Sequence, residues 1–143
     1  MHPLAETLLD EPVIAAVKTD DALTAALASP CSTVFLLAST LLNVGELVRR
    51  IHAAGKLAVV HIDLVDGLSA REVAVNSLIA LCHPDGIIST HPSLIRRARH
   101  QGLLTIQRAF ILDSLSLNNL SGQLEQGKPA FVEILPGTMP RAI

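Results

Sequence analysis

The chain has 143 residues, half of them apolar, and a formal net charge of −2 at neutral pH. This length is typical of one domain, and the apolar content is enough for a sizeable core. The slightly acidic balance gives no overall attraction to nucleic acid. With no Trp, no Tyr and three Phe, the chain also lacks the aromatic residues for a stacking surface that binds single strands.

The sequence contains no segment that predicts membrane insertion or secretion. Its most apolar stretch, residues 33–48, is interrupted by Ser, Thr, Asn, Gly and Glu, and is too polar to span a bilayer. Residues 1–12 carry acidic side chains and no Lys or Arg, unlike the start of a signal peptide. Cys31 and Cys82 lie far apart without a CxxC spacing, as expected for reduced thiols. We therefore predict a cytoplasmic protein without membrane contact.

Short apolar, β-branched runs alternate with helical segments along the chain. Strands are predicted, in order, at Pro12–Val17, Thr33–Leu37, Leu57–Leu64, Gly86–Ser89, Leu103–Gln107 and Phe131–Leu135. Helices are predicted between them at Asp20–Leu27, Val44–Ala54, Ser69–Leu81, Pro92–Arg99 and Ser114–Gln126. This alternation predicts an α/β fold with parallel strands joined by helical crossovers.

The choice within this class is between a TIM-type (β/α) barrel and a doubly wound sheet. The sequence contains neither GxGxxG nor GxxxxGK[ST], and its polar residues gather after the strands, where barrels carry their sites. We therefore predict a barrel as one domain over residues 1–143. A closed barrel of this type has eight strands. About six are predicted here, so we expect the domain to lack its last two βα units and to self-associate, as a homo-oligomer, through unpaired strand edges.

Polar side chains occur where several predicted strands end. In Val59–Leu64, a period of two puts His61 and Asp63 on one face. The pattern recurs after other strands at Ser89, Gln107, Arg108 and Glu133. Converging around a barrel axis, these groups are predicted to bind a small, polyhydroxylated, anionic ligand. The alternative is a polar layer inside the barrel whose members satisfy one another.

Two other sequence patterns bear on metal binding and on RNA binding. The His61-x-Asp63 pair matches metal-ligand chemistry, but the other histidines lack ligand spacing, and no metal or other cofactor is predicted. The densest positive charge lies at Arg96, Arg97 and Arg99. This cluster is a candidate for contact with RNA phosphates, and its alternative is an ordinary solvated helix face. No nucleophile motif of a hydrolase is present, so no catalytic residue is assigned.

Four blocks of sequence, taken together, resemble one known family. They are VVHIDLVDGL at residues 59–68, DGIIST at 85–90, LLTIQR at 103–108 and EILPGTMP at 133–140. In this order and spacing they closely resemble the glycerol-3-phosphate-responsive antiterminators, over residues from about Pro12 to the C-terminus.

The resemblance implies a barrel protein that binds glycerol 3-phosphate and the leader messenger RNA of glycerol uptake and metabolism genes. Around the ligand it implies His61, Asp63, Ser89, Gln107, Arg108 and Glu133, with Gly137 shaping the last loop. Relatives continue into two further strands with a Gly-rich loop suited to phosphate, so we expect this chain to bind the phosphate weakly.

Two alternatives to this regulatory function remain. One is a phosphosugar-handling barrel enzyme with Asp63 or Glu133 as general base and His61 as acid. The other is a shortened relative that retains only self-association.

Overall fold

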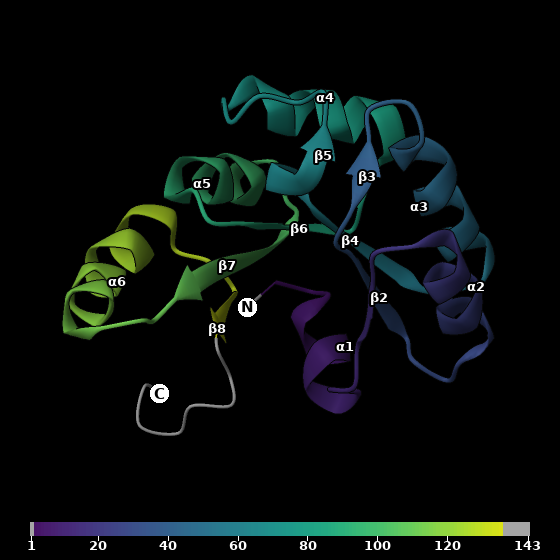
Figure 1. Ribbon diagram of the computed structural model, residues 1–143, viewed down its shortest axis with the longest axis horizontal. Helices are drawn as coiled ribbons and strands as arrows, with labels where there is room; N and C mark the ends of the chain where they lie inside the picture. Colours follow the sequence, from purple (N-terminus) through teal and green to yellow (C-terminus); the bar gives the residue numbers. More distant parts are fainter. Residues whose placement is uncertain (1, 136–143) are drawn as a thin grey trace.

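Six parallel strands form one curled sheet in the computed structural model, which describes residues 2–135. Their order across the sheet is β1-β2-β4-β6-β7-β8. Their bounds are β1 (Ala15–Val17), β2 (Thr33–Leu36), β4 (Leu57–His61), β6 (Gly86–Ser89), β7 (Leu104–Phe110) and β8 (Phe131–Leu135). The sheet curls into a half-barrel (Figure 1). The predicted incomplete TIM-type barrel with about six strands is thus confirmed.

Five helices cover the outer face of this sheet. They are α2 (Asp20–Ala28), α3 (Val44–Ala53), α4 (Val73–Cys82), α5 (Pro92–His100) and α6 (Ser114–Gly127), and Figure 1 shows them following one another around the outside of the curl. Strand residues such as Val34, Val60 and Ile87 share a core with α3 and α4. Among the described residues, no helix is long and apolar enough to cross a membrane.

A short helix, α1 (Ala5–Asp10), covers part of the inner face. Its buried residues Ala5 and Leu8 belong to a second core with Val59, Ile88 and Ile106. Neighbouring strand residues therefore pack on opposite faces, as the pleat of a strand requires. This inner core closes the amino-terminal end of the half-barrel and leaves the carboxyl end to polar side chains.

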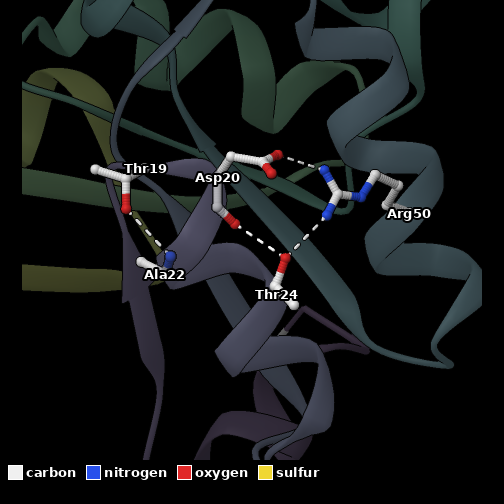
Figure 2. Close-up of polar contacts among 5 residues, drawn as sticks. All are labelled: Thr19, Asp20, Ala22, Thr24 and Arg50. Carbon is white, nitrogen blue, oxygen red and sulfur yellow. Dashed lines mark hydrogen bonds and ion pairs between the residues drawn. The ribbon is translucent and has the colours of Figure 1, made fainter.

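Polar contacts hold the first two outer helices together (Figure 2). The Thr19 hydroxyl caps α2 by accepting a hydrogen bond from the Ala22 amide at 3.1 Å. Arg50 of α3 contacts the Asp20 carboxylate at 2.6 Å and the Thr24 hydroxyl at 3.4 Å. Because Asp20 is largely exposed, this pair orients α2 against α3 more than it stabilises the fold.

The structure differs from several predicted boundaries. The strand predicted from Pro12 begins at Ala15, and the strand predicted to end at Gln107 continues to Phe110.

The strand expected over Leu57–Leu64 ends at His61 and is followed by a 3-10 turn, η1 (Ile62–Leu64). The chain turns there because β5 (Val65–Asp66) pairs with β3 (Ser39–Thr40) in a separate two-stranded sheet.

The helix expected from Ser69 begins instead at Val73, after bends and a turn over residues 70–72. Its N-cap residue makes no side-chain cap hydrogen bond. Ser69, the first residue of the predicted helix, therefore does not cap it.

Candidate functional site

Two groups of polar side chains lie at the carboxyl ends of the strands. The first, called here the strand-tip network, consists of Asp63, Ser89, Thr90 and Gln107. The second, called the inner-face cluster, consists of His61, Arg108 and Glu133. They sit on the same end of the sheet and differ in how far the chain itself satisfies their hydrogen bonds.

Asp63 is the centre of the strand-tip network. Its Oδ1 accepts a hydrogen bond from the Ser89 hydroxyl at 2.7 Å. Its Oδ2 accepts from the Thr90 amide and from the Thr90 hydroxyl, both at 2.8 Å. Ser89 Oγ accepts in turn from the His91 amide at 3.0 Å. The carboxylate of η1 therefore fixes the end of β6 and the loop that leads into α5.

Gln107 extends this network to β7. Its Nε2 donates to the Thr90 carbonyl at 3.0 Å and to the Arg108 carbonyl at 3.3 Å, whereas within residues 2–135 its Oε1 is buried without a partner. On β7, Leu104 and Ile106 pack in the inner core, whereas Ala109 packs with α6. By alternation Gln107 lies on the helix-covered face with Ala109. It does not face the axis with His61.

The inner-face cluster is defined by the same alternation. His61, Arg108 and Glu133 each follow by two positions a residue of the inner core, namely Val59, Ile106 and Phe131. Arg108 and Glu133 are also directly paired in the register of β7 and β8, and Arg108 Nη2 donates to Glu133 Oε1 at 3.0 Å. Three strands thus direct a cation, a carboxylate and an imidazole toward the inside of the curl.

This cluster is incompletely satisfied. Within residues 2–135, His61 Nδ1, Arg108 Nε and Glu133 Oε2 are buried without a hydrogen-bond partner. Buried polar atoms normally have partners, and leaving one unmet costs about 1–3 kcal/mol. These three unmet atoms, on one face at one end of the sheet, are available to a polar ligand.

The environment of His61 favours the neutral form of its side chain. Burial lowers the pKa of His61, and the nearby positive charge of Arg108 lowers it further. The carboxylates of Asp63 and Glu133 act in the opposite direction and do not reverse the shift. A neutral imidazole has one donor and one acceptor nitrogen, so it can bind a ligand hydroxyl with either.

Two cavities open at this end of the sheet. One of about 520 Å³ lies beside β1 and β2 and is lined by Lys18, Ser39, Asn43 and Asp63, among others. The other, of about 250 Å³, lies between the end of β7 and α6. The predicted site residues did not include Lys18 or Thr90, although both directly follow a strand, the same signal that identified the other candidates.

The predicted arginine cluster lies on α5. Arg96 pairs with Glu72 at 3.3 Å, and Arg97 Nε donates to Asn76 Oδ1 at 3.0 Å. Arg99 lies near the end of α5 beside His100. Gly137 lies outside the described residues. In the part of the chain that is described, no three His, Cys, Asp or Glu side chains are grouped to hold a metal ion.

Comparisons with known proteins agree on one family. A sequence model of the family described as "Glycerol-3-phosphate responsive antiterminator" matches residues 13–143. An Escherichia coli K12 protein, "Uncharacterized protein YgcP", is 40% identical over 141 residues, which cover 99% of this chain and 74% of that protein.

Two solved structures are also similar. The glycerol uptake operon antiterminator regulatory protein from Listeria monocytogenes has a TM-score of 0.85 at 31% identity, covering 89% of this chain and 69% of that one. A glycerol uptake operon antiterminator-related protein from Thermotoga maritima has a TM-score of 0.77 at 31% identity, with 87% and 70% covered.

Proposed function

This chain belongs to the glycerol-3-phosphate responsive antiterminator family, and from that membership we propose that it senses glycerol 3-phosphate and controls glycerol genes through a leader messenger RNA. Members of this family are regulatory proteins and not enzymes, so the phosphosugar-handling alternative is set aside. In the proposed function, His61 and Glu133 bind a ligand, Asp63 positions the strand ends around it, and none of the three transfers a proton in a reaction.

The observation that carries the ligand proposal is the unmet hydrogen bonding of the inner-face cluster. Glycerol 3-phosphate offers hydroxyl groups, which donate and accept, and a phosphate, which accepts. Glu133 Oε2 and the neutral His61 ring suit the hydroxyls. The Arg108 guanidinium suits the phosphate, because Arg forms strong, directional hydrogen bonds to phosphate oxygens. The ligand would then supply the partners that the chain does not.

The strand-tip network has a supporting role in this proposal. The Asp63 carboxylate already accepts three hydrogen bonds from Ser89 and Thr90, and Gln107 is tied to backbone carbonyls. We assign Asp63, Ser89 and Gln107 to positioning the strand ends around the ligand. Gly137 keeps its proposed place in the loop after β8, outside the described residues.

For RNA, we assign phosphate contacts to Arg96, Arg97 and Arg99 on α5. Arg96 and its partner Glu72 are both roughly half exposed, and an exposed pair of this kind contributes only about 0–1 kcal/mol. A phosphate therefore displaces Glu72 at little cost. The acidic net charge of the chain confines RNA attraction to local patches of this kind.

The function is tested with RNA transcribed from the leader of a glycerol-uptake operon of the same organism, including its terminator hairpin. Filter binding is measured with and without glycerol 3-phosphate, and with glycerol or inorganic phosphate as controls. We expect glycerol 3-phosphate alone to raise the affinity. Since coupling is reciprocal, the RNA should raise the affinity for glycerol 3-phosphate by the same factor. An RNA affinity that none of the three compounds changes would contradict the proposal.

A further inference from the structure

The cavity between β7 and α6 is not used by the function proposed above. Its volume is about 250 Å³, smaller than the roughly 300–1,000 Å³ of pockets for drug-sized ligands. From the end of β7 it is lined by Phe110, and from α6 by Ser116, Asn119 and Gln123. Arg108 and Thr90 line it on the side of the strand tips. Its size limits an occupant to a single small ring or a comparable group.

The side of α6 that lines this cavity is polar. Ser116, Asn119 and Gln123 stand three and four positions apart and so form one stripe along the helix. The neighbouring stripe, Leu120 and Leu124, packs against the ends of β7 and β8. A helix that covers a barrel strand is expected to be apolar where it meets the sheet. Here the amides of Asn119 and Gln123 line a cavity and are exposed within it.

The helix α6, which lines the cavity, packs closely against α5. Figure 1 shows the two helices side by side. At the end of α6, a Cβ on Gly127 would lie 3.1 Å from Ile95 Cγ2 and 3.3 Å from the Pro92 carbonyl oxygen. This close approach pins the helix to α5, which also carries the arginine cluster.

Phe110 is an exposed aromatic residue at the edge of the cavity. Of the three phenylalanines in the chain, Phe35 and Phe131 pack against the inner core, whereas Phe110 is 51% exposed. An accessible ring beside neutral amide groups matches the way proteins hold an unpaired base: the ring stacks on it, and side chains hydrogen-bond to its edge. The Asn and Gln amides can donate and accept, as a base edge requires.

We propose that this cavity binds one unpaired base of RNA, with Phe110 stacking on the base and Asn119 and Gln123 hydrogen-bonding to its edge. The proposal rests on the proposed function, because it assigns the base contact of the same RNA. Arg96 and Arg97 contact Glu72 and Asn76, on the side of α5 away from α6, so the phosphates assigned to them belong to nucleotides farther along the same RNA. A base in a duplex cannot enter the cavity, so the site selects a loop, a bulge or a single strand.

The base cavity and the ligand site share two residues. Arg108 lines the cavity and pairs with Glu133 in the inner-face cluster. Thr90 lines the cavity, is bound by Asp63 and accepts a hydrogen bond from Gln107 through its carbonyl. A ligand that engages Arg108 therefore acts on a wall of the base cavity. This is a direct physical link between glycerol 3-phosphate and RNA affinity.

The first test compares substitutions on α6 that differ only in whether they line the cavity. Affinity for single-stranded homopolymers of adenosine, cytidine and uridine is measured for the wild type, Phe110→Ala, Asn119→Ala and Gln123→Ala. Asn118→Ala is the matched control, because Asn118 is the same residue type on the same helix but does not line the cavity. We expect Phe110→Ala to weaken binding of the preferred homopolymer roughly tenfold to a hundredfold, and Asn118→Ala to leave it unchanged.

The second test uses the absence of Trp and Tyr from the chain. In Phe110→Trp the only indole lies at the cavity, so its fluorescence reports stacking directly. Single-stranded RNA should quench it, and duplex RNA should not. Suppose that the wild type binds RNA, that Phe110→Ala and Asn119→Ala bind it as well as Asn118→Ala does, and that RNA does not quench the indole. The proposal of a base-binding cavity is then wrong, and the proposed function stands. If the wild type binds none of the homopolymers or the leader RNA, both proposals fail.

Discussion

The strand-tip network and the inner-face cluster lie at the same end of one sheet but differ in how their polar groups are satisfied. In the network, Asp63 accepts three hydrogen bonds from Ser89 and Thr90, and within residues 2–135 the network has one buried side-chain atom without a partner, Gln107 Oε1. In the cluster, the pair of Arg108 and Glu133 makes one contact, and each of its three members retains a buried atom without a partner within residues 2–135.

This difference separates groups that hold the fold from groups that await a ligand. A saturated carboxylate contributes its free energy to folding, and its removal leaves its partners unmet. Buried polar groups without partners lower the stability of the free protein, and a ligand that supplies these partners raises it again. Substitutions in the strand-tip network should therefore lower mainly the stability of the fold, and substitutions in the inner-face cluster should lower mainly the affinity for the ligand.

The largest loss of stability is expected from Asp63→Ala. The substitution removes three hydrogen bonds to a carboxylate and leaves the Ser89 hydroxyl and the Thr90 amide without their partner. We expect a destabilisation of about 3 kcal/mol, measured by urea unfolding. Asp66→Ala is the control, since Asp66 is an exposed carboxylate close by. Equal stabilities for the two variants would show that the network does not hold the strand ends.

A smaller effect is expected from the pair of Arg108 and Glu133. Their side chains are 13% and 27% exposed, so Glu133→Met alone leaves a mostly buried guanidinium unpaired and should cost about 1–2 kcal/mol. The double variant Arg108→Met with Glu133→Met should cost less than the sum of the single variants, because it leaves no unpaired charge. It should nevertheless abolish binding of glycerol 3-phosphate. Additive single costs in a double-mutant cycle would argue against a coupled pair.

The smallest effect is expected from His61→Gln, and it appears only in the pH dependence of unfolding. The pKa of His61 is lowered from 6.5 in the folded state. Between the lower folded pKa and pH 6.5, the unfolded chain therefore binds a proton at this residue that the folded chain does not bind. Its contribution to stability is therefore full above pH 6.5 and is lost as the pH falls toward the lower folded value. One proton limits this slope to about 1.4 kcal/mol per pH unit.

The control for this prediction is the wild type, measured over the same pH range. The groups that face His61 are Arg108, Asp63 and Glu133, and all three are present in both proteins. The wild type should lose stability more steeply than His61→Gln below pH 6.5. Parallel curves would mean that His61 titrates as it does in the unfolded chain.

The sequence predicted the main strands and helices because their signal is local. Gly86–Ser89 and Phe131–Leu135 were predicted with the bounds observed. The predicted end of β4 was wrong, because the observed end depends on pairing between residues 39–40 and 65–66. The periodicity of the sequence does not show this contact. α1 was missed, since its six residues are too few for a helical pattern and gain their burial from the distant inner face.

The candidate site was predictable in position but not in orientation. Polar residues after strands identified the right end of the sheet. On β7, however, Leu103–Ile106 is largely apolar on both faces, so the sequence did not show that Arg108 faces inward and Gln107 outward. Likewise, the sequence showed Arg96 and Arg97 only as a basic cluster. Their partners, Glu72 and Asn76, come from the start of α4, which is distant in the sequence. These features depend on contacts between distant segments.

The most direct test of the inner-face cluster as the ligand site is a calorimetric titration with glycerol 3-phosphate. The wild type is compared with Arg108→Met and with Arg96→Met, a matched substitution on the surface of α5. We predict saturable binding by the wild type and by Arg96→Met, and an affinity at least about tenfold lower for Arg108→Met, the loss of one charged hydrogen bond. Equal affinity for the two variants, or no binding by the wild type, would contradict the account.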